Sequence, residues 1–272
     1  MEKPLRLLTL TLLLCLAITA LSCGGSNSNN ATAASSISGN WQFTLTRHNS
    51  TETSLFSGFL LQSGSSVTGS VTLSEGCQGV GAVTGTFDGQ NLQLTIGGFG
   101  QDFSLSASLP SGSSASSIIG GQFSTLQGGC LGFTSVGTWS AVRIAPLTGP
   151  FHGSFVLGNG SLATTYNVTG TMTQGPNIGA SNATLTGTLS DTDTNRFCPY
   201  FSNITMTGLI GGPTVNLTLY GSDGSQVGQI NSAIVTPDGT SLTTVGGSGG
   251  VMVNTLSSAC AARTGSVTVT FP

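Results

Sequence analysis

Apolar and polar residues alternate with a period of two through most of the chain beyond residue 36. In SVTGSVTLS (66–74) every second residue is valine, glycine or leucine, and the residues between them are serine or threonine. This alternation is typical of strands that bury one face and expose the other. The pattern returns in NLQLTI (91–96), SLSASL (104–109), ATLTGTL (183–189) and VNLTLY (215–220).

Turn-forming residues divide the alternating runs into short strands. Clusters of glycine, serine or asparagine interrupt them roughly every 8 to 14 residues, and nothing beyond the first 22 residues combines helical periodicity with caps. We therefore expect an all-β protein with about eight antiparallel strands in each half. Each half would be an up-and-down β-barrel, because closure removes exposed strand edges, or alternatively a flattened β-sandwich.

A five-residue sequence motif, which we call the phrase, recurs along the chain with small variations. It consists of an apolar residue, a hydroxyl residue, glycine, a second hydroxyl residue and a second apolar residue. Its glycine falls on the inner face together with the two apolar residues, so a missing side chain would let a tilted strand bend where barrel walls come close. The other interpretation is that these glycines hollow out a ligand cavity. The copies are FSGFL (56–60), VTGSV (67–71), VTGTF (83–87), VTGTM (168–172), LTGTL (185–189) and MTGLI (206–210).

The two halves of the chain can be aligned. Matching residue 37 onward with residue 147 onward places FSGFLLQ (56–62) over VTGTMTQ (168–174). GTFDGQNLQLTI (85–96) then matches GLIGGPTVNLTL (208–219) without a gap. Order and spacing together indicate an internal duplication. The predicted parts are a signal peptide (1–22), a lipidated cysteine and tether (23–36), and two β-barrel domains (37–145 and 146–272).

Charged residues are scarce, at 6% of the chain, and glycine is abundant, with 41 residues. Beyond residue 22 there are four arginines, eight acidic residues and no lysine, so no basic stripe could bind nucleic acid. Serine and threonine occupy the solvated strand faces, whereas a transmembrane barrel needs an apolar outward face with aromatic girdles. The composition therefore favours water-exposed domains without a nucleic-acid partner.

The first 24 residues carry the most specific signal in the chain. Lys3 and Arg6 precede an apolar run (7–21) that is too short for a permanent membrane helix and is typical of a secretory signal peptide. The run ends in ALSCG (20–24), which resembles the lipobox of bacterial lipoproteins. The resemblance implies cleavage before Cys23, acylation of its thiol (as by palmitate) and of its new amino group, and insertion into the lipid bilayer. An ordinary secreted protein cut nearby is the alternative.

The residue that follows Cys23 bears on where in the cell the protein is anchored, and the segment after the lipobox bears on how far the domains stand from the membrane. No aspartate follows Cys23, so the resemblance implies the outer membrane of the bacterial cell envelope, on its periplasmic or its surface-exposed side. GGSNSNNATAASS (24–36) has no residue that could pack in a core, and it would form a flexible tether of about 20 Å.

Four of the six cysteines remain once the signal peptide and the lipidated residue are set aside, and four cysteines permit three pairings. Oxidised cysteines fit an exported protein. Ligation of a metal is disfavoured, because no two of the four have CxxC-like spacing. The duplication favours one disulfide in each domain, Cys77 with Cys130 and Cys198 with Cys260.

The sequence matches catalytic and metal-binding motifs only poorly. GGSGG (246–250) matches a nucleophile pattern, but it lies in a glycine-rich connection with no helix after it. DTDTN (191–195) offers Asp191, Asp193 and Asn195 as calcium ligands, yet Arg196 stands where a calcium loop needs glycine, so a solvated loop is favoured. We expect no enzyme activity, no cofactor and no metal.

Aromatic residues supply the remaining site candidates. Trp41 lies on the first strand and Trp139 on the last strand of the first domain. The pattern from Gly39 to Trp41, with Arg143, resembles the GxW motif and closing arginine of the lipocalins, and LTGTL resembles strand phrases of the avidins. This calycin resemblance implies a tryptophan packed across the closed barrel end under the arginine, rather than stacked on a ligand. A second cluster either plugs the core or lines a binding mouth: Phe197, Tyr200 and Phe201.

Two functions are compatible with these patterns. The first is a membrane-anchored envelope lipoprotein that is non-catalytic, structural or interacting, with no ligand assigned and with the bilayer, through Cys23, or an envelope protein as partner. The alternative is a calycin-like binder that holds a small apolar or glycan ligand in a barrel interior. Filled interiors would favour the first function, and hollow interiors the second.

Overall fold

The structure is a computed structural model of the whole chain. It describes residues 36–73, 79–109, 117–126, 135–158, 163–177, 180–192, 203–244, 250–253 and 263–272. Residues 35–272 form one compact unit. The described residues lie in strands, turns and short connections, and among them there is no helix of the length and hydropathy that a membrane crossing needs.

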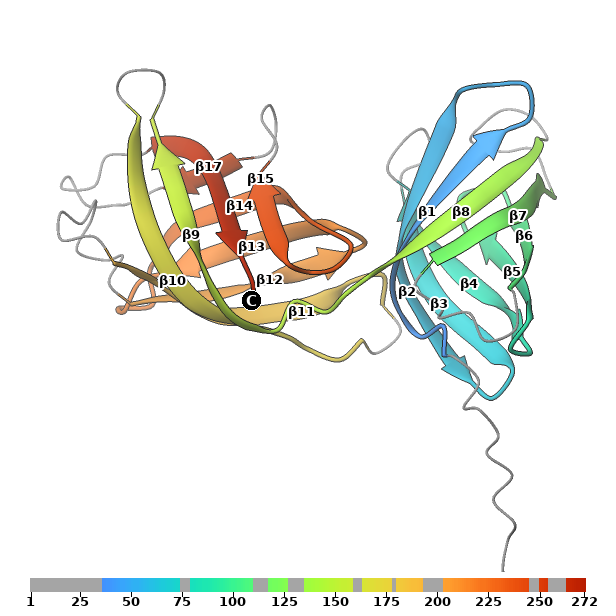
Figure 1. Ribbon diagram of the computed structural model, residues 1–272, viewed down its shortest axis with the longest axis horizontal. Coiled ribbons are helices and arrows are strands. Elements are labelled where there is room, and N and C mark those ends of the chain that lie inside the picture. Colours follow the sequence, from blue (N-terminus) through green and yellow to red (C-terminus); the bar gives the residue numbers. More distant parts are fainter. Residues whose placement is uncertain are drawn as a thin grey trace, which may run out of the picture. The chain divides into compact units, whose positions relative to one another are not determined.

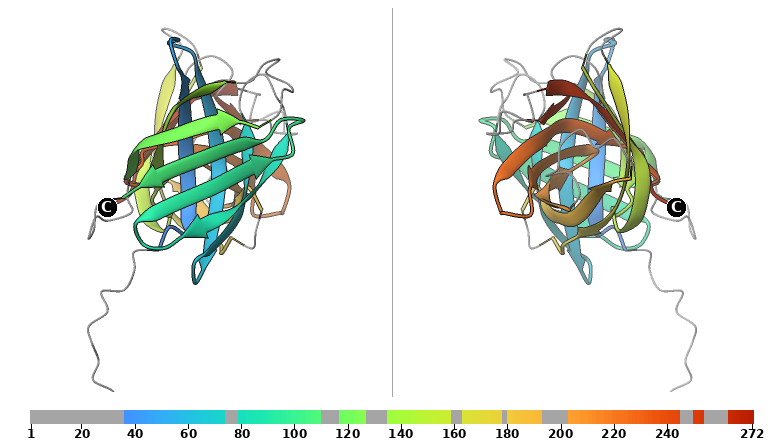
Figure 2. Two further views of the ribbon diagram at one scale, coloured as in Figure 1. Left: turned by 90° about the vertical axis from the view of Figure 1, so that its right-hand side faces the viewer. Right: turned by 90° about the vertical axis from the view of Figure 1, so that its left-hand side faces the viewer.

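The first eight strands form a closed barrel in simple up-and-down order (Figure 1). Each strand pairs antiparallel with the next, and β8 returns to β1, where Leu45 lies opposite Trp139. Neighbouring strands run side by side at a marked tilt in the left view of Figure 2. These strands are β1 (Gly39–Arg47), β2 (Thr53–Ser63), β3 (Ser66–Leu73), β4 (Val80–Phe87), β5 (Asn91–Gly97), β6 (Phe103–Ser108), β7 (Ser117–Thr125) and β8 (Val136–Ile144).

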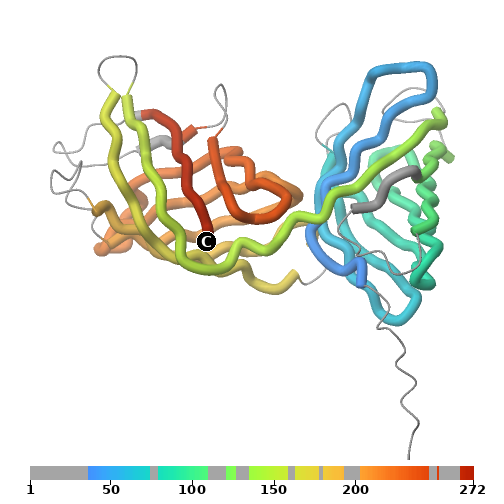
Figure 3. The backbone as a smooth tube through the Cα atoms, viewed as in Figure 1, coloured from blue at the N-terminus to red at the C-terminus, as the bar shows by residue number. Residues whose placement is uncertain are grey.

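The remaining strands form a second antiparallel barrel, closed by the pairing of β13 with β14. The chain passes into it directly, since β8 ends at Ile144 and β9 begins at Gly149, and Figure 3 traces this passage without interruption. The all-β prediction of two tandem barrels is thereby confirmed. Its strands are β9 (Gly149–Leu157), β10 (Thr164–Gln174), β11 (Ala183–Asp191), β12 (Ile204–Gly211), β13 (Thr214–Tyr220), β14 (Gln226–Val235), β15 (Ser241–Thr244), β16 (Gly250–Val253) and β17 (Arg263–Thr270).

Two short strands share one position in the second barrel. Both β15 and β16 pair with β14 on one side and with β17 on the other. Along β14, Ala233 lies opposite Thr244 of β15 and Asn231 lies opposite Gly250 of β16, so the two short strands follow one another along β14. Of the glycine-rich motif that matched a nucleophile pattern (246–250), only Gly250, the first residue of β16, lies in the described part of the chain.

Apolar side chains fill the centre of the first barrel. The Trp41 and Phe43 ring centroids lie 6.5 Å apart, and those of Phe43 and Trp139 lie 6.0 Å apart. Phe56 packs edge-on against Phe103 at 5.1 Å. These separations are those of rings in direct contact, so aromatic side chains occupy the interior.

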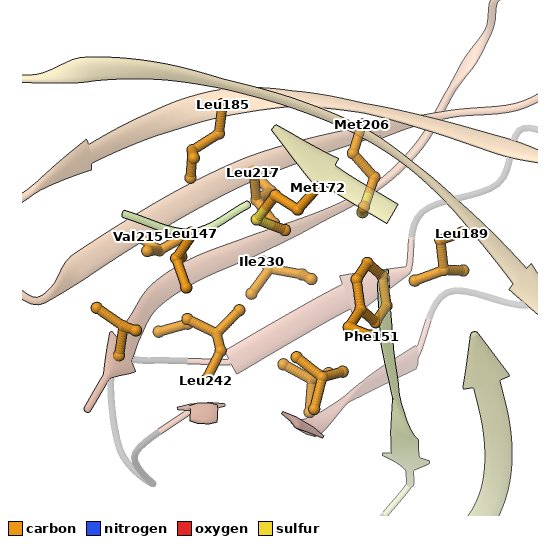
Figure 4. Close-up of a cluster of buried hydrophobic side chains, with 14 of the residues drawn as sticks. Leu147, Phe151, Met172, Leu185, Leu189, Met206, Val215, Leu217, Ile230 and Leu242 are labelled. Atoms are coloured by element: carbon orange, nitrogen blue, oxygen red, sulfur yellow. The ribbon is translucent and has the colours of Figure 1, made fainter. Parts of the chain in front are cut away.

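The second barrel is filled in the same way. Phe151 and Phe271 have ring centroids 5.6 Å apart, and both belong to one buried cluster with residues from strands β9 to β15 and β17. Figure 4 shows the labelled side chains of this cluster turned toward one another between the strands. They are Leu147, Phe151, Met172, Leu185, Leu189, Met206, Val215, Leu217, Ile230 and Leu242.

The six phrase glycines all lie where neighbouring strands come too close for a side chain. At each one, an added Cβ would overlap a backbone carbonyl oxygen of the adjacent strand. At Gly85, for example, the Cβ would meet the Gln93 carbonyl and the Leu94 Cα and side chain. The phrase is thus a device for close strand approach in a tightly coiled wall, as its sequence predicts. The glycines are Gly58, Gly69, Gly85, Gly170, Gly187 and Gly208.

A glutamine closes the start of each barrel, an arrangement we call the glutamine clasp. In the first barrel the Ile37 N–H donates to Gln62 Oε1 at 3.0 Å, and the Gln62 N–H donates to Ser38 Oγ at 2.8 Å. The same two bonds recur at the aligned positions of the second barrel, which supports the duplication. There, the Leu147 N–H donates to Gln174 Oε1 (3.1 Å) and the Gln174 N–H to Thr148 Oγ1 (3.3 Å).

Candidate functional site

Two copies of the repeated phrase depart from it at the same place. Four copies have serine or threonine after the glycine, but FSGFL has Phe59 and MTGLI has Leu209. Since Gly58 and Gly208 face inward, Phe59 and Leu209 face outward, where the other copies carry a hydroxyl. Packing inside the barrels does not explain why these two outward-facing residues are apolar, so they indicate a contact on the outer surface.

Phe59 is buried although it points away from its own barrel. Only 4% of its surface is exposed, and it belongs to the apolar cluster of the second barrel rather than to that of the first. Ile144, at the end of β8, is buried in the same cluster. The outward apolar residues of β2 and β8 thus fasten the first barrel to the second.

Asn40 contributes hydrogen bonds to this contact between the two barrels. It lies on the outward face of β1 between Gly39 and Trp41, yet only 2% of it is exposed. Its Nδ2 donates to the Gly212 carbonyl and its Oδ1 accepts from the Gly212 N–H, both at 2.7 Å. Gly212 lies in the turn between β12 and β13 with φ +57°, and a Cβ there would collide with Ser57. One amide side chain therefore satisfies both backbone groups of a buried turn residue.

A pocket of about 240 Å³ opens beside this attachment. Its side chains come from β2 and β3 of the first barrel and from β12, β13 and the residue before β11 of the second. None of the lining residues is charged. The side chains that line it are Ser57, Thr72, Asn182, Leu209, Thr214 and Asn216.

The predicted aromatic pair lies in the core of the first barrel. Trp41 donates its Nε1–H to the Ile37 carbonyl at 2.8 Å, and Trp139 donates its own to the Ser106 carbonyl at 3.0 Å. Phe43 separates the two indoles. Both indoles are buried with their N–H groups satisfied by backbone carbonyls.

Arg143 lies directly opposite Trp41 in the pairing of β8 with β1. Its Nη2 donates to the Ser38 carbonyl at 2.6 Å, and its guanidinium lies over Gly39, where a Cβ would meet Nε at 2.8 Å. The arginine side chain thus contacts the chain at Ser38 and Gly39, where β1 begins. Its role in closing the barrel stays a prediction.

Several predicted site residues lie outside the described part of the chain: Cys23, Cys77, Cys130, Asp193, Asn195, Phe197, Cys198, Tyr200, Phe201 and Cys260. The proposed disulfides therefore stay predictions. Asp191 is described, as the buried last residue of β11 opposite Val168. Among the described residues, no three of histidine, cysteine, aspartate and glutamate gather as metal ligands would.

Turns of the described chain hold three of its carboxyl groups through hydrogen bonds. Three aspartates, Asp88, Asp223 and Asp238, have pKa values lowered by hydrogen bonds from the turns they stand in. For Asp88, the Asn91 backbone N–H is the largest cause, and the pKa falls to about 2. Arg47 and Glu52 form an exposed ion pair at 3.1 Å. None of these five residues lines the pocket.

Sequence reasoning missed the attachment and the pocket beside it. Their signal was present in the two phrase copies where an apolar residue replaces the outward hydroxyl, at Phe59 and Leu209. Asn40 gave no comparable signal, because a single asparagine on a solvated strand face is ordinary.

Comparisons with known proteins give distant matches only. No protein-family model matches the chain, and no curated protein does. A crystal structure of a double mutant of the vaccine antigen Transferrin Binding Protein B from Haemophilus parasuis matches with 12% identity, covering 85% of this chain and 74% of the antigen, at a TM-score of 0.27. A protein of unknown function from the DUF3598 family of Nostoc punctiforme matches with 13% identity, covering 86% and 95%, at 0.23. At such TM-scores neither match indicates what this chain does.

Proposed function

We propose that the mature protein is an acylated lipoprotein of the bacterial cell envelope that acts without catalysis, as an interaction module on a flexible tether. The signal peptide and lipobox around Cys23 support the anchor, and residues 24–36 support the tether. Contacts with partners would be made by the outer faces of the two barrels and by their loops.

The filled interiors carry this proposal. Phe43 lies between Trp41 and Trp139 in the first barrel, and Phe151 packs on Phe271 in the second. A ligand inside either barrel would have to displace these buried rings, each of which gains several kcal/mol from burial and packing. The calycin-like alternative, with a ligand held in the interior, is therefore the weaker one.

The anchor is tested by the mass of the mature N-terminus and by membrane fractionation in a Gram-negative host. We expect an N-terminal Cys23 that carries a diacylglyceryl thioether and an amide-linked acyl chain, in the outer-membrane fraction. The variant Cys23→Ser should remain an unprocessed precursor, whereas Cys15→Ser, within the signal peptide, should mature normally. A mature protein that starts at another residue and is free of lipid would contradict the anchor.

The role of the barrels is tested separately. Protein purified in its native state is examined by native mass spectrometry and by organic extraction for small molecules retained from the cell. We expect no stoichiometric apolar compound, because side chains already occupy both interiors. A retained molecule that protects Trp41 or Trp139 from fluorescence quenchers would support the interior binder instead.

A further inference from the structure

We infer that the pocket between β2–β3 of the first barrel and β12–β13 of the second binds one ring of an uncharged, polyhydroxylated ligand, as found in a neutral oligosaccharide. This inference deepens the proposed function, on which it rests for the envelope setting. It names the chemical class that the outer faces of the barrels would recognise.

The pocket offers hydrogen-bonding groups that the described protein leaves unused. The side chains of Ser57, Asn182 and Thr214 form no hydrogen bond with other described residues. Asn216 accepts the Ser232 N–H through Oδ1 at 2.8 Å, and this bond fixes the amide so that Nδ2 remains available as a donor. Thr72 donates to the Ser57 carbonyl at 3.2 Å and keeps its lone pairs for a ligand. Donors and acceptors thus line one pocket from several strands.

The lining favours a neutral ligand. It holds no side chain that could pair with a charge, so a charged group entering the pocket would lose hydration without compensation. Hydroxyl groups of a sugar, by contrast, both donate and accept hydrogen bonds, as the serine, threonine and asparagine side chains require.

An apolar surface accompanies these polar groups. Leu209, in the pocket lining, is 47% exposed. Ile234, which is 38% exposed, lies opposite Thr214 on the neighbouring strand β14. A pyranose ring has an apolar C–H face beside its hydroxyl edge, so such a ring can use both kinds of contact. This accounts for a leucine at a position where four of the six phrases have a hydroxyl.

The walls of the pocket are held in place before any ligand binds. Gly212, in the turn that joins β12 and β13, is fixed by the two 2.7 Å hydrogen bonds of Asn40 and lies against Ser57. Such preorganisation lowers the cost of ordering side chains on binding.

The size of the pocket limits what it can enclose. Its volume of about 240 Å³ is below the roughly 300–1,000 Å³ typical of pockets that enclose a drug-sized molecule. One sugar ring of a longer chain fits this space better than a whole oligosaccharide.

The test is saturation-transfer-difference NMR and isothermal titration on the mature, acylated full-length protein in a detergent without a sugar headgroup. The probes are maltotriose and the trimer of N-acetylglucosamine, with trigalacturonate as the charged counterpart. We expect at least one neutral trisaccharide to bind and trigalacturonate not to bind.

Variants locate the binding. The double variant Ser57→Ala, Thr214→Val removes two hydroxyls that form no hydrogen bond with the described protein, so it should fold normally. We expect it to weaken binding five- to tenfold. Thr205→Val is the matched control, since Thr205 is an exposed residue of β12 outside the pocket lining, and its affinity should be unchanged.

Three results would overturn the inference: no neutral probe binds, trigalacturonate binds as well as they do, or the double variant binds as tightly as Thr205→Val. The two proposals fail separately. An acylated envelope protein that binds no neutral probe refutes only the pocket, and a protein that binds sugar but lacks acyl chains refutes only the anchor.

Discussion

Single residues determine how closely the barrel walls approach. Six glycines at equivalent places of the repeated phrase face inward against a carbonyl of a neighbouring strand. Glycine normally weakens a strand because it has no side chain to pack. Here the missing side chain is what permits the close contact, and Gly137, Gly153 and Gly265 make the same kind of contact outside the phrase.

We predict that Gly85→Ala destabilises the protein by about 3 kcal/mol, because the new methyl group must displace the backbone of β5 at Gln93 and Leu94. The free energy of unfolding is measured by denaturant titration. Thr84→Ala, at the exposed neighbouring position of β4, is the control and should change it by less than about 1 kcal/mol. Equal effects of the two substitutions would show that the strands are not in close contact at Gly85.

At the scale of elements, hairpins and clasps fix the strand ends. The turn between β4 and β5 depends on Asp88, whose carboxylate accepts the Asn91 N–H at 2.6 Å, the Gln90 N–H at 2.8 Å and the Asn91 Nδ2 at 3.0 Å. These bonds favour the ionised carboxyl, which explains why its pKa is lowered.

The pH dependence of this hairpin follows from that pKa. The Asp88 carboxyl has a pKa of about 2 in the folded protein against an ordinary 3.8, so its stabilising effect is complete above the ordinary value and is lost as the pH falls toward 2. We expect the difference in melting temperature between wild type and Asp88→Ala to close over that interval. A carboxyl carbon NMR titration with its midpoint near 3.8 would contradict this account.

The glutamine clasp gives a prediction that can be compared between the two barrels. Gln62→Ala leaves the buried Ile37 N–H without its acceptor, and Gln174→Ala does the same to Leu147. We expect each substitution to cost about 1–2 kcal/mol and to accelerate hydrogen exchange at the amide concerned. Gln93→Ala, at an exposed position of β5, serves as the control. An effect in one barrel alone would argue against equivalent clasps.

The period-two alternation predicted most of the strands. A strand that buries one face needs an apolar residue at every second position, and this spacing is visible in the sequence. The phrase glycines and the duplication were likewise readable from spacing. Hydrogen bonds between side chains and residues far away in the sequence could not be predicted. Gln62 reaches Ile37, and Asn40 reaches Gly212, through side chains whose partners depend on the closed fold. That β15 and β16 occupy one position between β14 and β17 was also not predicted, because a glycine-rich run in the sequence is equally typical of a connection between neighbouring strands.

At the scale of the whole molecule, the two barrels are joined by a mixed apolar and polar attachment. Phe59 and Ile144 are buried in the cluster of the second barrel, and Asn40 satisfies both backbone groups of Gly212. The domains should therefore unfold with mutual stabilisation, although each has its own core.

We predict that Asn40→Ala lowers the free energy of unfolding by about 2–4 kcal/mol, because the buried N–H and carbonyl of Gly212 lose their partner. In scanning calorimetry, the unfolding temperatures of the two barrels should also differ more than they do in the wild type. Gln42→Ala, at the next outward position of β1, should leave the profile as in wild type. Identical profiles for both variants would mean that Asn40 does not couple the barrels.

Buried rings lie inside both barrels, so we expect any partner to bind on the outside of the molecule. Crystals under xenon pressure would reveal a hollow interior, because xenon enters dry apolar cavities but not close-packed cores. We expect no ordered xenon among Trp41, Phe43 and Trp139, and none beside Phe151. A well-occupied xenon atom at either place would show a hollow interior and would restore the interior binder as the better explanation.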